Sequence, residues 1–329
     1  MKQTLRCLLV AVLLLILLVG LDYTEIVDVP GIDPTELGLG DRPSVVEPAG
    51  PRDPSEPLPT PDDPEDRPAA PQVRLVTWNL YNFGRTKDDQ EISVAAQTLR
   101  DADLVAVQEV VTSPPGAQAI GKLDRALDRT GAAWDYRISP PTTGPGTEKY
   151  AFLWKPSRLR LLGRAWLEAS LADSLDREPY LARFEHRESG RTLLVASLHA
   201  VPTSKDPERE IVLLDRLHWQ YQTDHVVLAG DFNLDEDDTA FDELRGLSYA
   251  AVLDDQPTSL RRKRRDGPEG HLANEYDNIF YETCPFRQTE SGVLDFTSRF
   301  STLKEARSLS DHLPVYADVQ WAPSPPTCL

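Results

Sequence analysis

Polar side chains that could do chemistry stand directly after an apolar run near the middle of the chain. Residues 226–229 are apolar and of strand type, and Gly230, Asp231, Phe232 and Asn233 follow at once. In an extended segment, residues two apart point to the same side, so this pattern presents a carboxylate beside an amide. Their oxygens suit a hard cation such as Mg²⁺, or a phosphate held beside one. The four residues also fit an ordinary Asx turn, so their role depends on their neighbours in the fold.

Further polar groups recur where other apolar runs end. In chain order they are Trp78-Asn79, Gln108-Glu109, Glu148 with Tyr150, Arg177, His199, Asp277-Asn278 and Ser310-Asp311-His312. Together they offer what phosphoester hydrolysis needs: ligands for a cation, a group that deprotonates water and a proton for the departing oxygen. His199 and His312 are the candidate proton carriers, because imidazole titrates near neutral pH. The other four histidines have no such setting.

This order of groups resembles the endonuclease/exonuclease/phosphatase superfamily, and within it the pancreatic deoxyribonuclease I-like nucleases. The resemblance covers residues 73 to 320. It rests on Val107-Gln108-Glu109-Val110, Glu148-Lys149-Tyr150-Ala151-Phe152, Arg177-Glu178-Pro179, Ser197-Leu198-His199, Gly230-Asp231-Phe232-Asn233 and Ser310-Asp311-His312-Leu313-Pro314-Val315. It implies an α/β (α+β) fold, a four-layered sandwich of two mixed β-sheets flanked by helices.

The resemblance also implies a metal site and two oriented histidines. Glu109 would hold Mg²⁺ or Mn²⁺, with Asn79 beside it and Asp311 contributing, and Ca²⁺ is a further candidate ion. Glu148 would pair with His199, and Asp277 would pair with His312. Either His312 or Asp231 would activate water, while His199 would protonate the leaving oxygen.

The substrate-binding groups follow from the same resemblance. Asp231 and Asn233 would grip the scissile phosphate or position the water, Arg177 would neutralise phosphate charge, and Tyr150 would contact substrate. Two positions depart from the pancreatic type. Val111 stands where a basic residue reads the DNA minor groove, and Gly146 stands where a tyrosine stacks on a sugar. The departures put duplex DNA in doubt more than phosphoester hydrolysis.

A basic cluster offers a compensating feature. Arg261, Arg262, Lys263, Arg264 and Arg265 lie twelve residues before Asp277, in a loop that we expect to pass the site. Five adjacent cations could clasp a nucleic-acid backbone, and they equally fit a solvated loop tip. Changing all five to Ser is expected to weaken nucleic-acid cleavage.

The elements that must position these residues are strands with helices between some of them. Apolar runs predict strands at 73–80, 104–107, 150–154, 193–198, 226–229, 276–281 and 313–319. Apolar residues at helical spacing predict helices over Pro207 to Tyr221 and Ala117 to Arg129. Hairpin-like stretches from 150 to 198 add to a pattern that favours α/β layers around mixed sheets.

The chain divides into four parts by composition. Residues 1–22 read as a signal peptide or signal anchor, since two cations precede an apolar run over residues 7–21 that is short for a membrane span of ~20 residues. Residues 23–72 read as a disordered Pro/Asp/Glu-rich tether. Residues 73–321 form the catalytic domain, and residues 322–329 a flexible tail. We therefore expect an exported monomer that is secreted or anchored in the cell envelope.

Charge and cysteine content exclude some classes. The formal net charge is −18, with 5 cations and 13 acids in residues 1–72 and 30 cations and 40 acids in the rest. Such an acidic domain does not favour non-specific duplex binding, although a nuclease can gather its acids around a metal. No Cys/His spacing fits zinc, and Cys284 and Cys328 could pair only if the tail folds back.

Three functions are consistent with these observations. The leading hypothesis is a metal-dependent nuclease, with nucleic acid as its substrate. The second is a sphingomyelinase-like or inositol-phosphatase-like hydrolase of the same superfamily. The third is a binding module without catalysis, which should show no EDTA-sensitive hydrolysis of any phosphoester.

Overall fold

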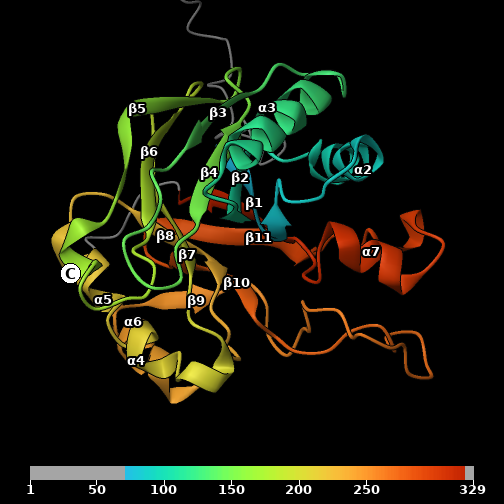
Figure 1. Ribbon diagram of the computed structural model, residues 1–329. Coiled ribbons are helices and arrows are strands. Elements are labelled where there is room, and N and C mark those ends of the chain that lie inside the picture. Colours follow the sequence, from blue (N-terminus) through green and yellow to red (C-terminus); the bar gives the residue numbers. More distant parts are fainter. Residues whose placement is uncertain (1–70, 323–329) are drawn as a thin grey trace, which may run out of the picture. The chain divides into compact units, whose positions relative to one another are not determined.

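Two six-stranded β-sheets form the centre of the domain (Figure 1). The computed structural model describes residues 71–322. The first sheet runs β11 (Phe286–Val293), β12 (Val315–Trp321), β1 (Gln72–Phe83), β2 (Leu104–Val110), β4 (Lys149–Trp154), β3 (Asp135–Ile138). The second runs β5 (Leu159–Leu167), β6 (Tyr180–His186), β7 (Thr192–His199), β8 (Val226–Asp231), β10 (Asp277–Glu282), β9 (Tyr249–Ala251). Each sheet is mixed, because β1–β2 and β7–β8 are parallel while their other pairs are antiparallel.

Helices cover the outer faces of both sheets (Figure 1). The first sheet is covered by α2 (Asp89–Leu99), α3 (Pro114–Asp128) and α7 (Leu303–Leu309), and the second by α4 (Glu208–Ile211), α5 (Asp215–Gln220) and α6 (Asp242–Gly246). Single 3₁₀ turns lie at Ala169–Leu171, Thr203–Lys205, Thr239–Phe241 and Thr297–Arg299. Two helices begin at capping boxes, in which Asp88 pairs with Glu91 and Thr302 pairs with Glu305. These boxes satisfy backbone N–H groups that the first helical turn leaves unpaired.

Three apolar cores follow from the alternation of side chains along the strands. In β1, Val76, Trp78 and Leu80 pack under the helices of the first sheet, whereas Val73 and Leu75 face the second sheet. In β7, Leu193 and Val195 likewise face the middle core, and their neighbours Leu194, Ala196 and Leu198 pack under α4–α6. Successive strand residues point to opposite faces, so each central strand contributes to two cores. The predicted four-layered sandwich is confirmed.

The expected elements are mostly present, with one helix wrong. All seven predicted strands occur, and the helix predicted over residues 117–129 is α3. The single helix predicted over residues 207–221 is two short helices, α4 and α5. Between them Leu213 and Leu214 donate their N–H groups to carbonyls three residues back, which tightens the chain out of α-helical geometry. Sequence periodicity survives such a break because the apolar side chains still reach one core.

Apart from residues 71, 72 and 322, the leader, tether and tail predicted from composition lie outside the described residues, as does Cys328; Gln72, predicted as the end of the tether, begins β1. Within residues 71–322, no helix has the length and apolar character needed to cross a membrane.

Candidate active site

The predicted site residues meet at one edge of the space between the two sheets. Strand register places three of them in one row of the second sheet, because His199 pairs with Asp231 and Asp231 pairs with Asp277. Parallel strands β7 and β8 end there, and antiparallel β10 begins there. Glu148 precedes the antiparallel strand β4 and His312 precedes β12, so the starts of these strands lie beside the ends of β2 and β1.

These residues continue rows of side chains that deeper in the protein form the middle core. In β8, Val227 and Ala229 face that core and Asp231 comes next on the same side. In β10, Asp277 begins the inward-facing row, and Ile279 and Tyr281 continue this row into the middle core. The site is therefore the polar rim of an apolar core, and the low polarity beneath it strengthens electrostatic interactions between its charged groups.

A ladder of buried polar side chains joins the two sheets just below the site. Gln108 Nε2 lies 3.1 Å from Thr77 Oγ1 and 2.8 Å from Ser197 Oγ, and all three residues are fully buried. Thr77 and Gln108 belong to the first sheet, whereas Ser197 belongs to the second. The ladder fixes one sheet against the other at the depth where the site begins. Gln108 precedes the predicted metal ligand Glu109, but no pattern in the sequence indicates that it bridges the sheets.

Close approach of backbones explains Gly230, which lies inside β8. A Cβ atom there would lie 1.9 Å from the carbonyl oxygen of Leu198 on β7. The glycine therefore serves strand packing, whereas the turn comes at Asn233, whose φ is +53°. Asn233 donates its backbone N–H to Asp231 Oδ1 at 3.1 Å, which steadies that carboxylate.

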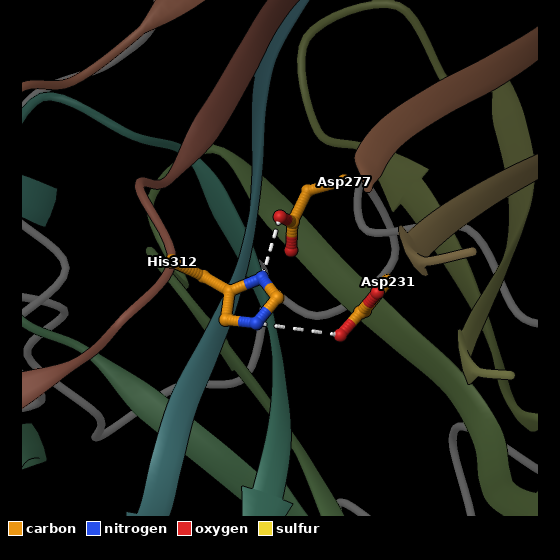
Figure 2. Close-up of side chains that lie close together, drawn as sticks. All are labelled: Asp231, Asp277 and His312. Carbon is orange, nitrogen blue, oxygen red and sulfur yellow. Dashed lines mark hydrogen bonds and ion pairs between the residues drawn. The ribbon is translucent and has the colours of Figure 1, made fainter. Parts of the chain in front are cut away.

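His312 lies between two carboxylates (Figure 2). Its Nδ1 is 2.7 Å from Asp277 Oδ2, and its Nε2 is 3.7 Å from Asp231 Oδ2. Asp277 Oδ2 also accepts a 2.7 Å hydrogen bond from the Thr258 hydroxyl. The Ser310 hydroxyl accepts the backbone N–H of His312 at 3.0 Å and donates to the carbonyl of Asn79. Asp277 thus holds Nδ1 of the imidazole, and Ser310 holds the backbone of His312. Nε2 is left directed at Asp231.

His199 has a matching arrangement. Its Nδ1 lies 3.0 Å from Glu148 Oε2, and its Nε2 lies 3.4 Å from Asp231 Oδ2. Glu148 also forms an ion pair with Nε of Arg177 at 3.0 Å. Both expected acid–histidine pairs, Glu148 with His199 and Asp277 with His312, are present. In each pair the carboxylate takes Nδ1 and leaves Nε2 for chemistry.

Asp231 is the centre of the site. Its Oδ2 accepts a 3.0 Å hydrogen bond from Asn79 Nδ2 and faces the Nε2 atoms of His199 and His312. One carboxylate oxygen therefore meets two imidazoles and one amide. Such a group can accept a proton from water and pass charge to either histidine.

The charges shift the histidine pKa values in one direction. Burial lowers the pKa of His312, but the carboxylates of Asp277 and Asp231 outweigh it and raise that pKa well above its usual value. For His199, burial likewise lowers the pKa, and Glu148 and Asp231 raise it by more. Burial raises the pKa of Asp277 to about 6, although a charged His312 opposes this rise. Both shifts favour protonated imidazoles beside the Asp231 carboxylate.

Glu109 leaves the regular strand to reach the site. The β2–β4 register shifts between Val107 and Val110, and Glu109 has a φ of +59°. Its Oε2 accepts the N–H of Asn82 at 2.7 Å, and its Oε1 accepts Asn79 Nδ2 at 3.1 Å. Among residues 71–322 it takes part in no ion pair within 4.0 Å. A carboxylate held by neutral donors, with lone pairs to spare, fits a hard cation.

Asn79 and Arg177 make contacts within the protein, and their predicted roles remain predictions. Asn79 Oδ1 accepts the N–H of Tyr81 while its Nδ2 donates to Glu109 and Asp231. Arg177 Nη1 donates to the carbonyls of His199 and Ala200, and its Nε pairs with Glu148. The predicted role of Tyr150 is corrected. Tyr150 does not reach substrate, because it is fully buried in the middle core.

Two further predictions gain a location and remain predictions. Asn233 donates one amide N–H to the carbonyl of Ala200 at 3.1 Å and is 7% exposed, so only part of its amide faces the site. Asp311 pairs through Oδ2 with Arg307 at 3.0 Å and stays partly exposed. It can still offer its other oxygen to a cation.

A surface cavity of about 670 Å³ connects His312 with the basic cluster. Its lining comprises Ser259, Leu260, Arg261, Arg262, Lys263, Arg264, Arg265, Ala273, Asn274, Tyr276, Arg307, Asp311 and His312. The five cations come from the long loop between β9 and β10, which projects beside α7 (Figure 1). The expected passage of this loop beside the site is confirmed. Arg307 adds a sixth cation, which no sequence motif singles out.

Comparisons with known proteins agree with this geometry. Residues 76–312 match the Endonuclease/Exonuclease/phosphatase family. The chain is 30% identical over 271 residues to a deoxyribonuclease of Thioalkalivibrio sp. (strain K90mix), covering 75% of this chain and 71% of that protein. It is 28% identical over 273 residues to deoxyribonuclease-1-like 1 of Sus scrofa, covering 77% and 82%.

A solved structure supports the same fold. An endonuclease/exonuclease/phosphatase family protein from Bacteroides thetaiotaomicron superposes with a TM-score of 0.58 at 17% identity, covering 76% of this chain and 98% of that protein. The family match includes Asn79, Glu109, His199, Asp231 and Asp277, which lie on strands, and it ends at His312. With two carboxylate-oriented imidazoles around one aspartate, the chain belongs to the endonuclease/exonuclease/phosphatase family.

Proposed function

We propose that this protein is a divalent-metal-dependent nuclease that hydrolyses phosphodiester bonds inside nucleic-acid chains. The observation that carries the proposal is the cavity in which Arg261–Arg265 and Arg307 adjoin His312. The phosphates of a polyanion can contact such a row of cations beyond the site, whereas a small phosphoester is too short to reach them. The deoxyribonuclease names of the relatives support the same substrate class.

The proposed chemistry is attack of water on phosphorus with proton transfers through Asp231 and the histidines. Asp231 takes the proton of the attacking water, because its Oδ2 is the one carboxylate oxygen that both Nε2 atoms approach. A protonated His199 gives its proton to the departing oxygen, and the raised pKa of its imidazole favours this protonated form. His312, held by Asp277, supplies positive charge to the phosphate.

A divalent cation fits beside Glu109. Glu109 and one oxygen of Asp311 would hold Mg²⁺ or Mn²⁺, since these are hard oxygen donors. The cation would neutralise phosphate charge and polarise the phosphorus–oxygen bond. A second cluster, Asp231, Asp277 and His312, also brings three ligand atoms within 4.8 Å of one another. Its imidazole nitrogen suits Mn²⁺ better than Mg²⁺, so the metal preference of the enzyme distinguishes the two sites.

We further propose export of the chain as a monomer, with residues 7–21 as a cleaved signal or a membrane anchor and residues 23–72 as a tether. The supporting observation is composition: a basic start, an apolar run and a Pro/Asp/Glu-rich segment. Fractionation of cells that express the full chain, with the N-terminus of the product sequenced, separates secretion from anchoring. A full-length product in the cytosol would contradict export.

A substrate panel tests the catalytic proposal. The purified full-length chain is offered plasmid DNA, single-stranded DNA, RNA, sphingomyelin and inositol phosphates with Mg²⁺ or Mn²⁺, and His199→Ala serves as the blank. We expect EDTA-sensitive cleavage of nucleic acid that is absent from the blank. Turnover of lipid or inositol phosphate with inert nucleic acids would overturn the proposal.

A further inference from the structure

An exposed aromatic ring stands beside the site, next to the predicted metal ligand Glu109. Tyr81 is 43% exposed, and it is one of three large hydrophobic residues in the described part of the chain with such exposure. It lies two residues beyond Asn79 on β1, and its backbone N–H donates to Asn79 Oδ1 at 3.0 Å. The Cα atoms of Asn79 and Tyr81 can therefore be at most about 7 Å apart. This distance equals two nucleotide steps in a stacked nucleic-acid strand, at about 3.4 Å per nucleotide.

The backbone is strained where this ring is presented. Tyr81 and Asn82 have φ values of +37° and +51°, and Glu109 beside them has +59°. Asn tolerates this region, but a bulky residue such as Tyr enters it at a cost. The strained turn directs the N–H of Asn82 to Glu109 Oε2. Strain explains how Glu109 is held, but it does not explain why a tyrosine occupies a position that Asn or Gly would fill more easily.

Lys87 holds the ring in place. Its Nζ lies 5.6 Å from the centre of the Tyr81 ring and donates to the carbonyl of Ser308. The same ammonium is close enough to Glu109 and Asp311 to interact with both carboxylates. The ring therefore lies beside the two predicted metal ligands, with a cation over one face, and Tyr81 as a whole is 43% exposed.

We infer that Tyr81, with Lys87 over its ring, is a stacking platform for the base of a nucleotide next to the scissile phosphate. The inference rests on the proposed nuclease function and narrows its substrate to a strand whose bases are unpaired at that point, because a base in a duplex has no free face to offer. Aromatic stacking accepts any base, so the platform adds affinity without sequence preference. Together with the basic cavity, it gives the strand two holding points, an aromatic ring for a base and a row of cations for the phosphates.

The test compares Tyr81→Phe, Tyr81→Ala and Tyr81→Asn in the full-length chain on a single-stranded oligodeoxynucleotide and on its duplex. The single strand is also made with one abasic nucleotide at each position near the cut. We expect Tyr81→Ala to raise KM for the single strand about tenfold with kcat changed less than twofold, and Tyr81→Phe to keep both. The Tyr81→Ala effect should disappear for the substrate whose abasic nucleotide occupies the platform. Trp219→Ala, which removes another exposed aromatic ring on α5, should change nothing.

Tyr81→Asn separates binding from folding. Asn fits the positive φ, so its thermal unfolding midpoint should equal or exceed that of the unchanged protein while KM rises as for Tyr81→Ala. An unchanged KM in Tyr81→Ala, or an equal effect on every abasic substrate, would overturn the platform while leaving the nuclease proposal intact. Failure of the unchanged protein to cut any nucleic acid would overturn the nuclease proposal itself.

Discussion

The Nε2 atom of His199 lies 3.4 Å from Oδ2 of Asp231, across two parallel strands whose register pairs these residues. The backbone sets this distance, because neighbouring residues in one row of a sheet place their side chains on the same face. Asp277 extends this row on β10, and its hydrogen bond with Nδ1 of His312 orients that imidazole toward the site. The acid–base centre is thus a property of sheet register more than of flexible loops.

Loss of either site histidine should remove most of the activity. His199→Ala and His312→Ala are each expected to lower kcat on a phosphodiester about 10²- to 10⁴-fold, because each removes an oriented proton carrier or charge. His218→Ala is the matched control, since His218 lies on α5 and belongs to none of the pairs around Asp231. Steady-state kinetics with circular dichroism as a folding check decides the outcome. Comparable losses in His218→Ala would contradict the assignment.

Glu109→Gln should weaken metal binding more than it changes the fold. The change keeps the shape of the side chain and removes the charge that a hard cation needs. We expect the Mg²⁺ concentration at half-maximal activity to rise at least tenfold. High Mg²⁺ should restore part of the wild-type rate. Glu185→Gln, on β6, is the control. An unchanged metal requirement would place the cation at Asp231, Asp277 and His312 instead.

Replacing the basic cluster should change salt dependence. With Arg261–Arg265 changed to Ser, nucleic-acid binding should weaken, and the slope of log affinity against log salt should fall by ~0.7 to ~0.9 for every phosphate that the protein no longer neutralises. The control replaces five exposed arginines that do not line the cavity: Arg100, Arg129, Arg160, Arg187 and Arg287. Equal slopes in the cluster variant and the unchanged protein would remove the loop from substrate binding.

Thr258 should act through Asp277. Its hydroxyl donates to Asp277 Oδ2 at 2.7 Å and accepts the backbone N–H groups of Asp277 and Tyr276 at 2.9 and 3.1 Å. Thr258→Val removes these bonds in a fully buried place and is expected to cost roughly 2 kcal/mol of unfolding free energy. The pH profile of kcat should shift as well, because Asp277 then holds His312 less firmly. Thr258→Ser should restore the profile, and a profile unchanged in Thr258→Val would contradict the positioning role.

Asp124 predicts a pH effect on stability. Burial, with Asp128 and Asp135 nearby, raises its pKa to about 6 from 3.8. The folded state therefore favours the protonated form, and its stability falls as pH rises from about 4 through about 6. At pH 8 the free energy of unfolding of Asp124→Asn should exceed that of the unchanged protein by about 1 kcal/mol. This value is reduced because Asp124 is partly exposed to solvent. The two proteins should not differ below about pH 4, and urea titrations at both pH values measure this difference.

The apolar runs that form strands, and the polar residues at their ends, can be predicted from the amino-acid sequence. The seven predicted strands occur because apolar runs mark buried strands, and the polar residues at one end of each site strand lie at one rim. The pairings of Glu148 with His199 and Asp277 with His312 came from the resemblance, and the structure bears them out. The wrong assignment of Tyr150 has the opposite cause. It lies one step deeper than Glu148 on the same inward row, and only the packed sheets decide where the rim ends and the core begins.

The amino-acid sequence by itself determined which reactive side chains this protein contains and which strands lie next to them. It also determined the acidic, proline-rich character of the first 72 residues. Only the tertiary structure decided how the groups are used. Asn79 became a donor, Arg177 a partner of Glu148, and Tyr81 an exposed ring beside Glu109. The physical reason is that hydrogen-bond direction and burial depend on strands far apart in the chain. Their relative position is fixed by sheet register and by packing of the core between the sheets.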